Sequence, residues 1–189
     1  DKETGIKWPL ADYALLPNMA IVDADNCMTA PRGLTAASGI DVMTHAIESY
    51  VSIMASDYTK GLSERAAKLV FENLPSSFTN GAKDPHAREE MHNASCMAGM
   101  AFANAFLGIC HSLAHSLGST FHIAHGLANA LMLSYVIEYN GTDQPTKQGM
   151  LPQYKYPWVK GRYARIADML HLADDLEGDS PEIRGQKMA

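Results

Sequence analysis

Apolar residues recur at steps of three and four along most of the chain, which is the period of helices that each bury one face. The first such stretch follows Pro31, with apolar positions at Ile40, Met43, Ile47, Val51 and Met54. The next follows Asp57, which we expect to cap a helix. We expect Pro75 to stop that helix, because proline lacks the backbone N–H that a helix interior needs. The pattern predicts two successive helices in the first half of the chain.

Glycines and one capping pair divide the second half into further helices. Asp84 followed by Pro85 is typical of a helix start, a cap and then a first-turn proline. We expect the helix that begins there to break near Gly108, and the helix after the break to end at Gly118. Two more helices are predicted, over residues 127–138 and 158–172. The fold class that follows is mostly α.

The amino-terminal stretch has a different pattern. Pro9 and Pro17 interrupt it, and residues 19–22 form a short apolar run that predicts one buried strand. One strand cannot form a sheet alone. We therefore expect residues 1–24 to be the remnant of a neighbouring domain with its hinge, and residues 25–189 to be an all-helical domain. A first residue other than Met also suggests a fragment of something longer.

Composition and charge narrow the class of partner. Apolar residues make up 47% of the chain and charged residues 19%, which is typical of a globular protein. The net charge of −6 argues against nucleic acid or an anionic membrane as partner, because no basic patch could neutralise phosphates. Three cysteines without a CxxC pair fit a reducing cytoplasm rather than a disulfide framework. Small molecules are the expected partners.

The uncharged run over residues 91–137 raises the question of a membrane span. It contains no Asp, Glu, Lys or Arg. Asparagine, serine and histidine interrupt it too often for a span, which needs about 18 predominantly apolar residues in succession. We expect a buried core segment and no membrane.

Half of the chain's eight histidines gather in one stretch: His111, His115, His122 and His125. His111 and His115 are four residues apart, so they share one helix face. Asp41 and His45 repeat this spacing upstream, with Glu48 about one further turn along. Buried imidazoles need hydrogen-bond partners or a metal. The two pairs predict one metal between two helices, and histidines mixed with a carboxylate suit iron(II) or zinc.

The residues alone leave the chemistry of this site open. Ser112 follows His111, so the HSLAH segment lacks the glutamate of HExxH metalloproteases. The chain also contains no GxGxxG, GxxxxGK[ST] or GxSxG motif. A metal here could polarise a carbonyl during hydride transfer, or activate water in a hydrolase with Glu48 as the base. A third reading is a non-catalytic helical module whose histidines stabilise the fold.

Two long segments carry a resemblance that narrows this choice. They are IVDADNCMTAPRGLTAASGIDVMTHAIE at 21–48 and GICHSLAHSLGSTFHIAHGLA at 108–128. They resemble the two signature stretches of the iron-containing alcohol dehydrogenases. Nearly the whole chain shares the likeness, which is greatest to the alcohol dehydrogenase half of bifunctional aldehyde–alcohol dehydrogenases.

The resemblance implies roles for individual residues. The implied metal ligands are Asp41, His45, His111 and His125. His115 is implied to lie beside the nicotinamide, as a cofactor contact and a catalytic proton relay, and not to be a ligand. Phe102 is implied to line the substrate pocket, and Lys7 to contact the cofactor at the hinge. Ala124 stands where the family usually has proline, which we expect to loosen the turn that carries His125.

The same resemblance implies the activity and the partners. It predicts the helical metal-binding domain of a two-domain, NAD-dependent alcohol dehydrogenase, with Fe²⁺ or Zn²⁺, acting on a small primary alcohol or aldehyde such as ethanol or acetaldehyde. The nucleotide-binding domain of the same protein, homo-oligomers and filaments are the further expected partners. A cytoplasmic enzyme of fermentation is implied. The family's glycine-rich pyrophosphate-binding region is missing from these residues, so we expect this chain to hold metal but to bind nicotinamide poorly.

Overall fold

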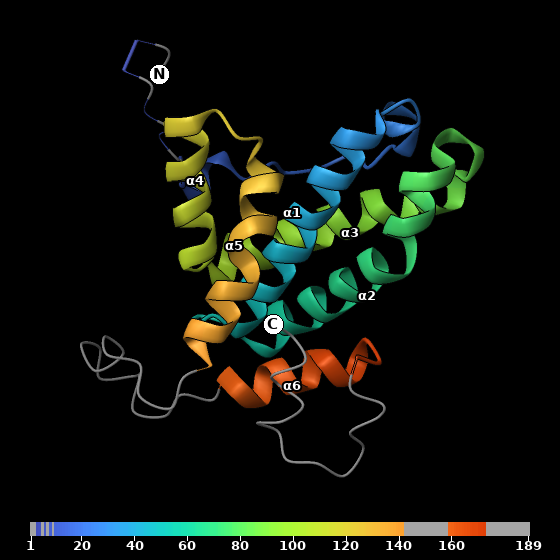
Figure 1. The fold of residues 1–189 in the computed structure, drawn as a ribbon. Helices are drawn as coiled ribbons and strands as arrows, with labels where there is room; N and C mark the ends of the chain where they lie inside the picture. Colours follow the sequence, from blue (N-terminus) through green and yellow to red (C-terminus); the bar gives the residue numbers. More distant parts are fainter. Residues whose placement is uncertain (1–2, 5, 7, 9, 142–158, 173–189) are drawn as a thin grey trace.

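The computed structural model describes residues 3–4, 6, 8, 10–141 and 159–172, and this part of the chain is mostly helical (Figure 1). The α-helices are α1 (Arg32–Val51), α2 (Asp57–Asn80), α3 (Pro85–Ala105), α4 (Ile109–Phe121), α5 (His125–Asn140) and α6 (Val159–Met169). Short 3₁₀ helices are η1 (Tyr13–Leu15), η2 (Ala24–Cys27) and η3 (Gly81–Lys83). The predicted fold class is confirmed.

The strand predicted over residues 19–22 is wrong. The backbone there is irregular, and within the described ranges no strand forms. A strand needs a neighbour for its N–H and C=O groups, and the described residues offer none. The apolar side chains of the run lie in the open instead, with Met19 79% and Ile21 84% exposed.

Helix starts follow the capping signals closely. Asp84 caps α3 by accepting from the Ala87 N–H at 3.0 Å, with Pro85 in the first turn, as predicted. The cap of α2 is Ser56 rather than Asp57, which is the first helical residue. Ser56 and Thr59 each accept a hydrogen bond from the other's backbone N–H, a reciprocal capping box.

Two predicted helix ends are wrong, because packing outweighs the local signal. Pro75 lies inside α2, which continues to Asn80 and buries Ser77 one half-turn further on. Gly118 lies inside α4 and is itself buried, and that helix ends only at Phe121, where His122 takes the left-handed conformation (φ 56°). A glycine inside a helix costs only about 1 kcal/mol, which the burial of Gly118 itself can offset.

Helix α1 runs through the centre of the bundle and contacts α2, α3, α5 and α6 (Figure 1). One apolar cluster joins α1 to α2 and α3: Val42, Ala46, Ala66, Ala67, Leu69, Val70, Ala94 and Ala98. A second joins α1 to α5 and α6: Ile47, Tyr50, Ile137, Tyr163, Ile166 and Leu170. Asp41 and His45 of α1 therefore sit on a helix that is fixed on several sides.

Glycines let α5 and α2 approach α1 closely. A Cβ atom added to Gly126 of α5 would lie 1.8 Å from the Ala37 carbonyl oxygen of α1, and one added to Gly39 of α1 would lie 2.4 Å from Leu74 Cδ1 of α2. The first contact is with backbone, which cannot swing aside. Gly126 follows His125 directly, so this close approach also fixes how near His125 comes to α1.

Helices α3 and α4 meet at a sharp break, where Phe106 has a φ of 60°. Among the described helices none is by itself long and apolar enough to cross a membrane. The pair α3 and α4 would qualify together by length and composition, but it is bent by 108°. The break turns the start of α4 towards the middle of α1.

Candidate metal centre

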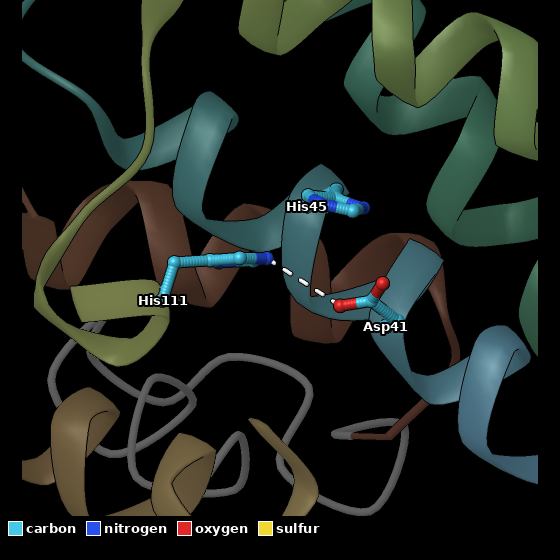
Figure 2. A group of neighbouring side chains, drawn as sticks. All are labelled: Asp41, His45 and His111. Atoms are coloured by element: carbon cyan, nitrogen blue, oxygen red, sulfur yellow. Dashed lines mark ion pairs between the residues drawn. The ribbon is translucent and has the colours of Figure 1, made fainter. Parts of the chain in front are cut away.

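Three helices bring the predicted site residues together. Asp41 and His45 lie one turn apart on α1, His111 lies in the first turn of α4, and His125 is the first residue of α5. Figure 2 shows the side chains of Asp41, His45 and His111 converging from α1 and α4. The His45 and His111 rings stack, with centroids 4.4 Å apart. Residues far apart in the chain thus share one small site.

The separations between donor atoms suit a single ion. One donor atom from each of Asp41, His45 and His111 lies within 4.8 Å of the others. Asp41 Oδ1 is 3.5 Å from His111 Nε2 and 3.5 Å from His125 Nε2. Two ligands about 2.1 Å from one metal lie about 3.4 Å apart at a tetrahedral angle. The group of two imidazoles and one carboxylate therefore fits a divalent transition metal, and His125 Nε2 lies next to its carboxylate.

Asn129 adds a fifth polar group at the same point. Its side-chain nitrogen lies 2.6 Å from Asp41 Oδ1, 3.2 Å from His111 Nε2 and 3.3 Å from His125 Nε2. An amide has only two hydrogens to share among these three acceptors. Asn129 is fully buried, so water does not share these contacts. One carboxylate oxygen and two ring nitrogens therefore surround a buried point that favours a positive charge.

The surroundings of the site shift the pKa values of Asp41, His45 and His111. Burial lowers the pKa of His45 to about 4, with help from the charges of His111 and His125, so its imidazole is neutral at pH 7. Burial alone would raise the pKa of Asp41, but the hydrogen bond from His111 and the charges of His45 and His125 lower it. Burial opposes a charge on His111, yet hydrogen bonds to Asp41 and Glu48 raise its pKa. The site offers an ionised carboxylate beside imidazoles.

Glu48 lies behind the site rather than in it. Its Oε2 is 2.6 Å from His111 Nδ1, the ring nitrogen that does not face Asp41. Its Oε1 accepts from the Cys110 backbone N–H at 2.8 Å, and the carboxylate is 3% exposed. A base for a metal-bound water must face the metal, so this geometry weighs against the hydrolase in which Glu48 is the base.

Two further residues named from sequence, His115 and Phe102, lie beside this group. The His115 ring is 5.0 Å from the His125 ring, and the Phe102 ring stacks on His45 at 4.6 Å. His122 is exposed at the end of α4. Lys7 lies outside the described residues.

Sequence reasoning missed the contact of Asn129 and the contact of Glu48 with His111. A signal for Asn129 was available, because it follows His125 by four residues and so shares its helix face. Glu48 was placed on the correct side of α1, but its contact with His111 depends on how α4 meets α1.

Among known protein families, the family model described as "Fe-containing alcohol dehydrogenase family, C-terminal" matches residues 35–186 of this chain. The chain belongs to the iron-containing alcohol dehydrogenase family. It is 53% identical over 188 residues to the bifunctional aldehyde-alcohol dehydrogenase AdhE of Escherichia coli K12, a match that covers 100% of this chain and 21% of AdhE. The predicted likeness to bifunctional enzymes of this family is confirmed.

Other relatives and solved structures agree. The aldehyde-alcohol dehydrogenase of Clostridium acetobutylicum is 51% identical, over 97% of this chain and 21% of its own. The iron-containing alcohol dehydrogenase of Thermococcus thioreducens superposes with a TM-score of 0.74 at 32% identity, over 94% of this chain and 41% of that one. This chain of the iron-containing alcohol dehydrogenase family therefore spans about a fifth of the bifunctional relatives.

Proposed function

We propose that this chain is the metal-binding domain of an NAD-dependent alcohol dehydrogenase, with Asp41, His45, His111 and His125 as the ligands of one Fe²⁺ or Zn²⁺ ion. The proposal is carried by the donor atoms of Asp41, His45 and His111, which lie within 4.8 Å of one another, and by His125 Nε2, which lies 3.5 Å from Asp41 Oδ1. The ligand assignment rests on that geometry together with membership of the iron-containing family.

The chemistry divides between the bound groups and the chain. When bound, the metal polarises the substrate oxygen and the nicotinamide exchanges the hydride. Asp41 contributes the negative charge of the ligand set, and His45 is neutral at pH 7 without having to release a proton. We assign to His115, whose ring lies 5.0 Å from that of His125, the transfer of a proton between solvent and the substrate oxygen. Phe102, stacked on His45, forms an apolar wall of the proposed substrate site.

The substrate class comes from the relatives. A 1-propanol dehydrogenase of Citrobacter freundii is 47% identical to this chain, and an NADPH-dependent butanol dehydrogenase of Clostridium saccharobutylicum is 44% identical. These names support a small primary alcohol or its aldehyde, such as ethanol or acetaldehyde. Because the butanol dehydrogenase is NADPH-dependent, NADP is the alternative to NAD as the proposed cofactor.

We also propose that residues 1–24 belong to the hinge and edge of a nucleotide-binding domain. The side chains of Leu10, Met19 and Ile21 are each more than three-quarters exposed. A second domain could cover these apolar side chains. Lys7 as a cofactor contact, the cytoplasmic location and homo-oligomers or filaments belong to the same proposal, and they rest on the resemblance.

The test is the metal content of the anaerobically purified chain. Wild type is compared with separate alanine variants of Asp41, His45, His111, His115 and His125. We expect about one metal per chain, lost in the four ligand variants and kept in His115→Ala. In the natural protein that contains these residues, His115→Ala should lower turnover. A folded wild type that takes up neither iron nor zinc would overturn the proposal.

A further inference from the structure

We infer that Glu48 is a positioning residue for the metal site. Its carboxylate holds the His111 ring so that Nε2 of His111 faces the ion, and the same carboxylate caps helix α4. This inference rests on the proposed metal site. Glu48 comes from the last turns of α1, whereas His111 belongs to another helix, so one side chain joins the two elements that carry most of the ligands.

The carboxylate uses both oxygens on the first turn of α4. Oε1 accepts from the Cys110 N–H at 2.8 Å, and Oε2 accepts from the His111 N–H at 3.2 Å. These are the second and third residues of the helix, whose N–H groups have no partner inside it. A capping side chain normally bonds those groups, but the cap position of α4 is Gly108, which has no side chain. Glu48 performs the capping from a distant part of the chain.

The same carboxylate fixes the His111 ring. Oε2 lies 2.6 Å from Nδ1, so Nδ1–H donates to the carboxylate, and Nε2 is the nitrogen whose lone pair a metal would take once the ring is neutral. Nε2 is the atom that lies 3.5 Å from Asp41 Oδ1. A ligand histidine held in this way by a carboxylate has its tautomer and its ring orientation set before the metal arrives.

Gly108 leaves room for this arrangement. A Cβ atom added there would lie 2.5 Å from Glu48 Oε1 and 3.2 Å from its carboxyl carbon. The backbone of Gly108 is extended, with φ −107° and ψ −157°, so alanine meets no backbone strain at this position. Its only conflict is with the Glu48 carboxylate. Gly108→Ala thus displaces the carboxylate without changing a polar group.

The experiment measures zinc affinity by chelator competition, and the visible absorption of the Co²⁺ form, in the 189-residue chain. Glu48→Gln puts an amide NH₂ against one of three N–H donors, and Gly108→Ala displaces the carboxylate. We expect both to weaken zinc binding about 10- to 100-fold and to alter the Co²⁺ spectrum, since a carboxylate behind a ligand histidine has effects of that size. Gly99→Ala is the control, because a Cβ there meets nothing within 4 Å.

The outcomes separate this inference from the proposed function. A wild type that binds no metal overturns the proposed function, and this inference with it. Wild-type zinc affinity and an unchanged Co²⁺ spectrum in both variants overturn the role of Glu48 and leave the metal site standing. Circular dichroism shows whether each variant folds. If Glu48→Gln does not fold, the zinc affinity and the Co²⁺ spectrum of Gly108→Ala decide whether Glu48 positions His111.

Discussion

The side-chain nitrogen of Asn129 lies 2.6 Å from Asp41 Oδ1, a short hydrogen bond from a fully buried amide to a carboxylate. Asn129→Asp would place a second carboxylate against the first. Without metal, the two negative charges repel each other in a buried site, so we expect a lower melting temperature than wild type. A divalent cation relieves that repulsion, so the zinc-induced rise in melting temperature should exceed that of wild type.

Differential scanning calorimetry with and without zinc measures both effects. Asn18→Asp makes the same chemical change at an exposed position ahead of α1, and it should shift stability by no more than about 0.5 kcal/mol. A zinc-induced rise in Asn129→Asp that is smaller than in wild type would show that the amide does not border the ion.

Gly126 controls how closely α5 approaches α1. Alanine there would bring its Cβ to 1.8 Å from the Ala37 carbonyl oxygen, so the two backbones must separate. Since His125 begins the same helix turn, it would move away from Asp41. We expect Gly126→Ala to lose about 1–3 kcal/mol of unfolding free energy, the usual cost of an overpacked core, and to lose bound metal. Urea unfolding and metal analysis check the two effects.

A second glycine provides the contrast. Gly61 lies in α2, and a Cβ there meets nothing within 4 Å. Gly61→Ala should raise stability by about 0.5–1 kcal/mol and keep the metal, because alanine favours a helix interior. Equal behaviour of the two alanine variants would mean that the contact between α1 and α5 does not position His125.

Local rules predicted the parts of this structure that depend on local spacing. The four-residue step from Asp41 to His45 places both on one face of α1, and the Asp84 and Pro85 pair starts α3. The stop expected at Pro75 failed where Ser77 of the following turn packs into the core, and the stop expected at Gly118 failed where Gly118 itself is buried. Such an outcome depends on partners that are distant in sequence.

The contacts behind the site follow the same division. Glu48 meets His111 only because the break at Phe106 turns α4 back towards α1. Asn129 meets Asp41 only because Gly126 lets α5 come close. Spacing identified the residues that can face a metal. The crossing of the helices decides which other side chains support them.

Alkaline pH should expose the coupling between Tyr50 and Glu64. The Tyr50 hydroxyl donates to Glu64 Oε1 at 2.9 Å, and burial together with that carboxylate raises the pKa of Tyr50 from 10.0 to about 12. The folded chain therefore holds the phenolic proton more tightly than the unfolded chain. This stabilisation is fully present below pH 10 and is lost as pH rises through 12.

Tyr50→Phe tests this dependence. The variant should be about 1 kcal/mol less stable at pH 7, for the lost hydrogen bond. It should also lose less of its remaining stability than wild type between pH 10 and 12. Tyr163, whose pKa burial also raises to about 12, keeps some slope in both proteins. Urea midpoints across this range provide the measurement, with Tyr58→Phe, 88% exposed, as the control. Parallel curves for wild type and Tyr50→Phe would contradict the prediction.

The turn before His125 already has the backbone of a proline. Ala124 has φ −56° and ψ 134°, and proline fixes φ near −65°. Within the described residues nothing accepts a hydrogen bond from the Ala124 N–H, while its carbonyl accepts from Ala128 at 2.9 Å and would still do so. We expect Ala124→Pro to raise stability by about 0.4–1 kcal/mol, by restricting the unfolded chain, and to keep metal affinity at or above that of wild type.

Ala130→Pro, at an exposed position inside α5, should instead cost about 3 kcal/mol. Melting temperatures and zinc titrations of the two variants decide the matter: a destabilised Ala124→Pro would mean that the turn needs a freedom at residue 124 that proline removes.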